Sequence, residues 1–294
     1  PRSTPLYSSA ASDVYKRQVQ DQGSIYRGAL QALFASRGKK SGSTPKNRRP
    51  KILSFKGGLA QLPKALAAQL GDSLLLNTSV TKLSLEGELV KLEFEDPASS
   101  LRARRVVIAT EADTAAKLIA PHSSTLSSAL LNIPYAPVGI LHLTFPRSAV
   151  SHPLDGFGFL ASPAKGRTIL GAIFTSSIFP ASAPDNQILL SIFCGGAVNP
   201  ELAAVDSPAV QAEVEQELRQ ALGIFGPIQV LASTYWPRAI PNFPLGHFKT
   251  QQLLDEFEAR SGKIFFLGNW ARGISVSDRI SEAEKLALRI KGLS

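Results

Sequence analysis

The chain has 294 residues, enough to bury one large hydrophobic core or two smaller ones. Its content of 44% hydrophobic and 19% charged residues is typical of a globular protein and excludes a disordered or fibrous one. The net charge of +9 would suit a polyanion, but no interleaved aromatic pattern accompanies it, so we expect no nucleic acid to bind.

The first eighteen residues are predicted to be foreign to the protein. Residues 1–18 lack the charged-plus-apolar build of a signal peptide, and the run from Ser9 to Gln18 resembles translated read-through of a sequencing adapter. A disordered natural tail is the alternative interpretation. On either interpretation these residues are left out of the fold.

Residues 19–51 are predicted to hold one short helix and a basic loop. The helix runs from Gly23 to Phe34, and lysines and arginines then crowd residues 37–51, which are rich in glycine, serine and proline. A charge run of this kind is usually a solvated loop, which is our first interpretation. Attraction to an anionic membrane surface is the second, so we also consider peripheral contact with the inner membrane.

Residues 52–120 are predicted to combine helix and strand. The helix covers Leu59 to Leu70, with leucines at helical spacing and Gly71 at its end. Strands are expected at residues 73–77, 80–85, 89–94 and 102–110. The last of these contains the apolar run Val106–Ala109, typical of a parallel strand covered on both faces.

Residues 121–227 are predicted to form a strand-rich insertion. Strands dominate from Gly139 to Cys194, and a helix then begins at Pro208, after the capping residue Ser207, and ends before Gly223. Its core stripe consists of Val210, Val214, Leu218 and Leu222. An insertion that returns the chain to its parent sheet commonly places a ligand cleft between the two parts.

One motif within the insertion imitates a nucleotide-binding turn. Gly156 to Ala161 matches G-x-G-x-x-A, but it does not lie between a buried strand and a helix, as such a turn should. We therefore predict a β-strand whose small residues face a ligand or another backbone.

Residues 228–294 are predicted to return to the α/β pattern. A strand at 228–236 and a helix at 250–260 precede a buried strand from Ile264, a loop with Gly268 and Gly273, and a helix to about Ile290. Ser275 and Asp278 fit the capping pattern of a helix start. A strand–glycine loop–helix junction aims backbone N–H groups and the positive helix end at one point, which suits an anionic or electron-rich ligand.

Trp236 has two interpretations. It ends a strand and precedes Pro237, so it could be an aromatic core residue, as burial statistics favour, or a ring packed against a flavin or another planar ligand. No Ser–His–Asp arrangement or carboxylate pair can be assigned, so the catalytic residues stay unknown.

Cysteine and histidine usage excludes several kinds of site. The single cysteine, Cys194, rules out an internal disulfide and a cysteine-based zinc site. It also indicates a reducing compartment, so we expect a cytoplasmic protein. The four histidines have no metal-binding spacing, so we predict no metal. Cys194 itself is expected to be an inert buried thiol.

Several segments together resemble the flavin-dependent protoporphyrinogen oxidases, within the wider FAD-containing amine oxidase-like group. The resemblance covers about Gly23 to Ile290. The segments that carry it are Gly23–Ala29, Ser54–Leu59 with Leu62-Pro63, Gly156–Leu160, Leu170–Phe174, Phe193–Gly196, Ala239–Phe243 with Gly246-His247, and Gly273–Asp278. It implies an α/β fold of mixed α+β character, in which part of a Rossmann-like FAD-binding domain (52–120 and 228–294) carries an inserted strand-rich substrate domain (121–227).

The resemblance also implies a site and a reaction. The FAD-binding residues would be Val80, Trp236, Gly268, Ile274, Ser275 and Val276, and the residues against a flat porphyrinogen would be Leu160, Ile173 and Phe193. The reaction implied is oxidation of protoporphyrinogen IX by hydride transfer to FAD, with molecular oxygen as final acceptor, in haem biosynthesis.

The chain departs from the family pattern in three respects. Arg279 stands where the family usually has a cysteine, and Asn242-Phe243 where it usually has Gln-Tyr. The glycine-rich nucleotide turn and the family's substrate-anchoring arginine are not in this sequence. We therefore expect this chain, as a C-terminal fragment, to bind FAD poorly and to be inactive alone. The alternatives are a coproporphyrinogen III oxidase, another amine oxidase-like flavoprotein, and a non-catalytic relic.

Overall fold

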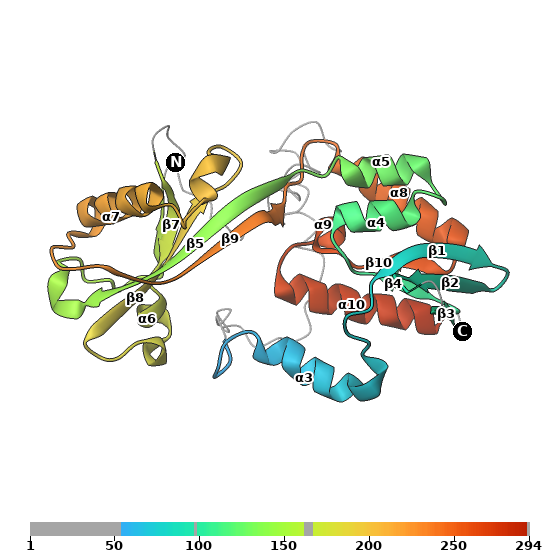
Figure 1. The fold of residues 1–294 in the computed structure, drawn as a ribbon, viewed down its shortest axis with the longest axis horizontal. Helices are drawn as coiled ribbons and strands as arrows, with labels where there is room; N and C mark the ends of the chain where they lie inside the picture. Colours follow the sequence, from blue (N-terminus) through green and yellow to red (C-terminus); the bar gives the residue numbers. More distant parts are fainter. Residues whose placement is uncertain (1–53, 97–98, 162–166, 293–294) are drawn as a thin grey trace, which may run out of the picture. The chain divides into compact units, whose positions relative to one another are not determined.

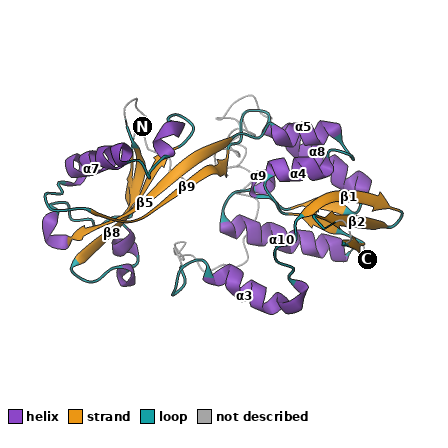
Figure 2. Cartoon of the chain, viewed as in Figure 1, coloured by secondary structure: helices purple, strands orange, loops and turns teal. Residues whose placement is uncertain are grey.

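The computed structural model describes residues 54–96, 99–161 and 167–292 (Figure 1). The predicted segments 1–18 and 19–51, with the helix Gly23–Phe34 and the basic loop, lie outside these residues. Contacts divide the chain into two units. The described part of the larger unit is 108–257 and 266–292, and that of the smaller unit is 54–107 and 258–265. Helices and strands occur together (Figure 2), which confirms the mixed α/β class, while the domain boundaries stay predictions.

The smaller unit contains one helix and an antiparallel sheet. Its elements are α3 (Gln61–Leu70), the 3-10 turn η2 (Gly71–Ser73), β1 (Val80–Glu86), β2 (Leu89–Phe94) and β3 (Ser100–Ala103), with the strands in the order β1-β2-β3. Leu83 and Val90 are the most buried side chains of this sheet, at 1% and 0% exposure.

Two strand predictions in this region were wrong. Residues 73–77 form no strand: η2 occupies the start, and Leu75 and Leu76 are 59% and 71% exposed, so no sheet among the described residues covers the leucine run. The predicted strand 102–110 is divided at Arg104-Arg105 into β3 and a second strand, β4 (Val106–Ile108). The helix α3 was predicted correctly.

β4 pairs with β10 (Ile264–Phe266) in a two-stranded sheet. The Val106 amide donates to the Lys263 carbonyl at 2.8 Å, and the Leu267 amide donates to the Ile108 carbonyl at 2.9 Å. Both strands advance in the same direction between these bonds, so they are parallel, as predicted. Val107 is 39% exposed, so the expected cover on both faces is incomplete among the described residues.

A five-stranded antiparallel sheet forms most of the insertion. Its strands are β5 (Tyr135–Pro146), β6 (Gly158–Leu160), β7 (Ile169–Ile173), β8 (Gln187–Gly195) and β9 (Gln229–Pro241), in the order β6-β7-β8-β5-β9. The prediction of a strand-dominated region is confirmed. Gly158 lies in β6, where a Cβ atom would meet the Ala172 carbonyl oxygen at 2.0 Å, so its motif belongs to a strand against another backbone, as predicted.

The helix α7 (Pro208–Leu222) covers one face of this sheet (Figure 1). Its buried residues are the four predicted ones, Val210, Val214, Leu218 and Leu222, and Gly223 ends it in the left-handed conformation. They pack in one core with alternate residues of β5 and β8, namely Leu141, Leu143, Phe145, Leu190, Ile192 and Cys194. Short helical turns join these strands: η3 (Arg147–Ala149), α6 (Thr175–Ile178), η4 (Pro180–Ser182) and η5 (Pro200–Ala203).

The remaining helices of the larger unit are α4 (Ala112–Ile119), α5 (Ser124–Leu131), α8 (His247–Ser261), α9 (Asn269–Arg272) and α10 (Val276–Lys291). The sequence predicted α8 and α10 but not the others. α4 and α5 pack together, and the Ser127 hydroxyl donates to the Ala116 carbonyl at 2.9 Å. In the part of the chain that the structure describes, no helix combines the length and apolar character needed to span a membrane.

Candidate functional site

The junction between β10 and α10 is the first candidate site. β10 is a fully buried strand, with Ile264, Phe265 and Phe266 between 0% and 2% exposed. The predicted strand–glycine loop–helix order is confirmed, with one addition: the loop contains the short helix α9. The indole of Trp270, in α9, is buried and its Nε1 donates to the Thr110 carbonyl at 2.9 Å, which fixes the loop to the chain beyond β4.

The start of α10 is capped as the sequence predicted. Ser275 Oγ accepts from the Asp278 amide at 3.1 Å, and Asp278 Oδ2 accepts from the Ser275 amide at 3.2 Å. This capping box satisfies two backbone donors. Among the described residues, no acceptor meets the next two amides, those of Val276 and Ser277.

This helix start fits an electron-rich or anionic group. Two donors remain open there, and the positive end of the helix lies at the same place. Ile274 is half-buried and Val276 is 54% exposed, so both can be reached from solvent. The Gly268 carbonyl accepts a hydrogen bond from Arg279, described next.

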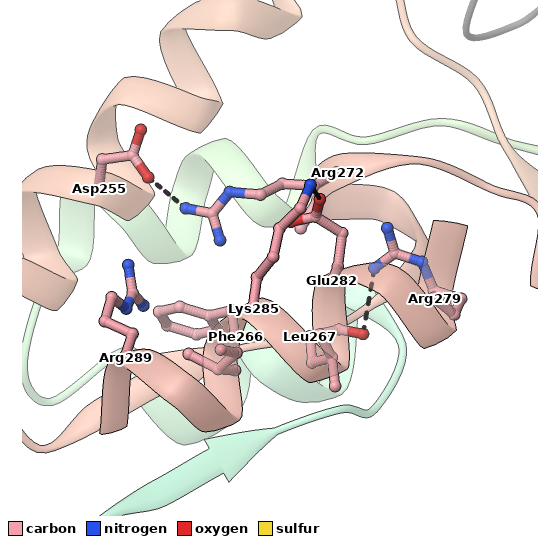
Figure 3. Close-up of a pocket in the computed structure, with 10 residues that line it drawn as sticks. Asp255, Phe266, Leu267, Arg272, Arg279, Glu282, Lys285 and Arg289 are labelled. Carbon is pink, nitrogen blue, oxygen red and sulfur yellow. Dashed lines mark hydrogen bonds and ion pairs between the residues drawn. The ribbon is translucent and has the colours of Figure 1, made fainter. Parts of the chain in front are cut away.

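A basic cavity of about 260 Å³ lies beside this junction (Figure 3). Its lining includes Arg272, Arg279, Lys285 and Arg289 but only two acids, Asp255 and Glu282. Arg272 pairs with Asp255, and Lys285 pairs with Glu282 at 2.8 Å. The sequence reasoning missed this cavity. The signal was present, because residues 279, 282, 285, 286 and 289 recur at helical spacing on one side of α10.

Arg279 holds the loop before α9 in place. Its Nη1 donates to the Gly268 carbonyl at 2.9 Å and to the Leu267 carbonyl at 3.4 Å. Burial lowers the pKa of the guanidinium, and the nearby Glu282 and Asp278 carboxylates oppose that shift. Its Nε and Nη2 are buried and meet no acceptor among the described residues. The residue that departs from the family pattern therefore supports the junction directly.

The second candidate site is the face of the five-stranded sheet opposite α7. Phe193 lies opposite Ile140 on β5 and Gly171 on β7, and Gly171 lies opposite Leu160 on β6. Residues that pair across strands, and residues two apart on a strand, share a face. Ile173, two residues from Gly171, is therefore on this face too.

The register thus brings the three predicted substrate residues together. Leu160 is 40% exposed, and Ile173 and Phe193 are half-buried, whereas Ala172 and Ile192 between them point into the core beneath α7. Leu160, Gly171 and Phe193 form a row across three strands. Gly171 has no side chain, so the surface is depressed between Leu160 and Phe193. The result is a broad, apolar, accessible surface.

Trp236 lies on the same face. It pairs with Val138, which pairs in turn with Gly195. Val138 is two residues from Ile140 and Gly195 is two residues from Phe193, so all of these positions share one face. Its side chain is 53% exposed, so Trp236 is not the core residue that burial statistics favour. An exposed ring next to an apolar surface is available to a planar ligand.

Val80 belongs to the smaller unit and is considered by itself. It is the first residue of β1, half-buried, and lies opposite Phe94 on β2. Its role toward a cofactor stays a prediction.

The described residues contain no group of three or more His, Cys, Asp or Glu side chains that could hold a metal ion. Cys194 is fully buried in the core, as predicted. Burial raises the pKa of its thiol to about 12, with a smaller contribution from the Glu217 carboxylate. A thiol of this kind is unreactive at neutral pH.

Comparisons with known proteins place these sites in context. Residues 7–278 match the profile of the flavin containing amine oxidoreductase family. The chain is 32% identical to the chloroplastic protoporphyrinogen oxidase of Nicotiana tabacum, over 92% of this chain and 52% of the relative. It is 30% identical to the coproporphyrinogen III oxidase of Propionibacterium freudenreichii, over 80% of this chain and 44% of the relative.

A crystal structure of a proposed protoporphyrinogen oxidase from Exiguobacterium sp. 255-15 has the same fold. It superimposes with a TM-score of 0.71 at 20% identity and covers 98% of this chain and 59% of that protein. The chain spans about half the length of the curated relatives it matches.

Proposed function

Because the chain belongs to the flavin containing amine oxidoreductase family, we propose that the whole protein oxidises protoporphyrinogen to protoporphyrin, with FAD as cofactor and molecular oxygen as acceptor. The observation that carries this proposal is the sheet face that unites Leu160, Ile173 and Phe193. A flat macrocycle buries most surface against a flat apolar wall, and burial of that surface supplies the binding free energy. The similarity to a protoporphyrinogen oxidase supports the same substrate class.

Residues of the junction would hold the flavin. The open amides of Val276 and Ser277 and the positive end of α10 would favour an electron-rich group of the cofactor, and the exposed Trp236 ring would pack against a planar group. We include Gly268, Ile274 and Ser275 in this set, and we propose Val80 of the smaller unit separately as a cofactor contact. The chemistry that FAD supplies when bound is hydride acceptance and the return of electrons to oxygen.

The apolar face has its own task in this scheme. Leu160, Ile173 and Phe193 would exclude water from one side of the macrocycle and fix its plane. Positioning of this kind is the protein's contribution when the cofactor carries the chemistry.

A second candidate substrate is coproporphyrinogen III, which the similarity to the Propionibacterium enzyme favours. Its macrocycle is the same and its rim carries more carboxylates, so the two candidates differ in the polar groups that surround the apolar face. The discriminating measurement is the same assay with both substrates.

The test uses the complete reading frame that contains this sequence. The purified protein, supplied with FAD, is mixed under air with each porphyrinogen, and the fluorescence of the aromatic porphyrin is followed. We expect fluorescence to develop with protoporphyrinogen. Fluorescence that develops with coproporphyrinogen alone would show that the substrate is coproporphyrinogen and not protoporphyrinogen. A protein that binds FAD and yields no porphyrin from either substrate would overturn the proposal and leave a non-catalytic relative.

We also propose peripheral contact with an anionic membrane surface, supported by the net charge of +9. Basic surfaces bind anionic lipids through long-range attraction that salt screens. Sedimentation with phosphatidylserine vesicles at low salt, and release at high salt, is the expected outcome. Protein that remains in the supernatant at low salt would dismiss this contact.

A further inference from the structure

The accessible sheet face carries one ionisable side chain near its centre, His142. His142 is the residue after Leu141 on β5, and it lies two positions from Ile140, which pairs with Phe193. It therefore shares the face of Phe193 and Ile173 rather than the core face beneath α7. The ring is half-buried.

A chain of hydroxyl groups holds the His142 ring. Nδ1 lies 3.0 Å from Ser191 Oγ, and Ser191 Oγ lies 2.8 Å from Thr175 Oγ1. Thr175 Oγ1 in turn donates to the Ile173 carbonyl at 3.4 Å. Ser191 is directly opposite His142 across the β5–β8 ladder, so the strands themselves fix this contact. One nitrogen of the ring is thus committed to the protein.

The other nitrogen, Nε2, is open. It makes no hydrogen bond to any described residue, and it is not among the buried polar atoms that lack a partner, so solvent reaches it. In the charged ring Nε2–H is a donor and Nδ1–H donates to Ser191, whose hydroxyl donates to Thr175. The neutral ring keeps its proton on Nε2 when Ser191 donates to Nδ1, and Thr175 must then donate to Ser191 instead of the Ile173 carbonyl.

The described strand neighbours of His142 on this face carry no charge. The residues opposite His142 are Ser191 and Ala232, and the diagonal neighbours are Leu189, Phe193 and Thr234. The short helix α6, which supplies Thr175, has the sequence Thr-Ser-Ser-Ile. Nε2–H is a hydrogen-bond donor in an apolar surface, and none of the neighbours named above is a carboxylate that could accept from it. Such a donor attracts an anionic acceptor on a ligand.

We propose that His142 binds a carboxylate of the substrate that lies on the apolar face, through a hydrogen bond donated by Nε2. Ser191 and Thr175 are the residues that position it. The inference rests on the proposed function, because it takes as ligand a flat apolar molecule that carries acidic groups at its rim. His142 then sets how the macrocycle is turned within its plane, while Leu160, Ile173 and Phe193 set the plane.

The test compares two ligands that differ only at the acid groups. Protoporphyrin IX and its dimethyl ester present the same macrocycle, with and without carboxylates. Binding to the 294-residue chain is followed by quenching of tryptophan fluorescence, since Trp236 lies exposed on this face and Trp270 is buried away from solvent. The variants are His142→Leu, His142→Gln and Thr144→Val. Thr144 serves as the matched control because it is a polar residue of the same face, two positions from His142.

We expect the unaltered chain to bind the free acid about tenfold more tightly than the ester, as one charge-assisted hydrogen bond allows. His142→Leu should bind both equally, with the affinity for the ester unchanged, and Thr144→Val should keep the preference. His142→Gln should keep part of it, because its amide can still donate.

Two results would contradict the inference in different ways. If His142→Leu binds the ester normally and still prefers the free acid tenfold, then His142 has no role in the recognition of the acid group. If the unaltered chain binds neither macrocycle, its apolar face is not a porphyrin surface and this inference falls, while the porphyrinogen assay of the complete protein decides the proposed function separately. Normal binding of the ester by each variant also reports that it has folded.

Discussion

A Cβ atom on Gly268 would lie 2.0 Å from Nε1 of Trp270. The indole occupies the space that any side chain at position 268 would need, and it uses that position to reach the Thr110 carbonyl. Gly268 is therefore required by the packing of the protein itself. The sequence suggested that a ligand approaches the backbone closely at Gly268. In this structure the indole of Trp270 makes that close approach.

Gly268→Ala should destabilise the protein markedly. The added methyl group must displace a fully buried indole, and overpacking of this kind costs about 1–3 kcal/mol. Urea unfolding measures the change in free energy. Gly292→Ala is the control, because a Cβ atom there meets its nearest neighbour at an ordinary 3.6 Å. Equal stability of the two variants would contradict the role of Trp270.

Ser275→Ala should remove the cap of α10 and cost about 1 kcal/mol of folding free energy. The variant loses the acceptor for the Asp278 amide. Ser277→Ala is the matched control, since the hydrogen bond of Ser277 Oγ among the described residues is the one with Ser275 Oγ, at 3.4 Å. The free energies of unfolding in urea should differ between the variants. If Ser277→Ala costs as much as Ser275→Ala, the capping box is not the stabilising contact.

Cys194 should resist thiol reagents until the protein unfolds. Labelling at pH 8 should be roughly a hundredfold slower, or more, in the native protein than in urea, because the buried thiol stays protonated. The raised pKa also has a consequence for stability. The folded protein keeps a proton that the unfolded chain gives up. The stabilisation that comes from the protonated Cys194 thiol is therefore fully present below the ordinary pKa of 9.0 and is lost as the pH rises toward about 12.

The pH dependence has a simple control, Cys194→Ala. Comparison of urea midpoints at pH 8 and pH 10 should show that the unaltered chain loses more stability than the variant over this interval. A larger loss in the variant would show that Cys194 does not contribute with this sign.

Phe193→Ala should weaken porphyrinogen binding in the complete enzyme. The ring is part of the apolar row, and its loss removes contact area worth about 1–3 kcal/mol, or roughly a fivefold to 150-fold increase in KM. Phe225→Ala is the control, because Phe225 is 72% exposed on the connection between α7 and β9. Unchanged KM in the Phe193 variant would remove this residue from the substrate surface.

Periodic elements could be predicted from the sequence because their cause is local. The stripe of α7, its proline start and its glycine end are all read from adjacent residues, and the structure buries the stripe as expected. The run at residues 73–77 misled the prediction for the opposite reason. Three consecutive leucines favour a strand only where a sheet covers them, and that depends on distant residues.

The candidate site also has features that depend on adjacent residues and features that depend on distant ones. The cap at Ser275 follows from a four-residue pattern, and it is present. The shared face of Leu160 and Phe193 depends on the register of three strands, which the resemblance suggested and residue spacing alone could not supply. The basic cavity and the hydroxyl chain at His142 escaped prediction, because each joins side chains from separate elements.

The bond from Trp270 to Thr110 joins residues 160 positions apart along the chain. Nearly all of the insertion lies between them, and its sheet is built mostly from strands that are closer in sequence. Closing a long loop is entropically costly and slow, so contacts of this span form late in folding. During synthesis the five-stranded sheet can assemble while β4 still lacks its partner. The junction that would hold the flavin is then completed last, when β10 and α10 leave the ribosome, and β4 must be kept from other strands until that moment.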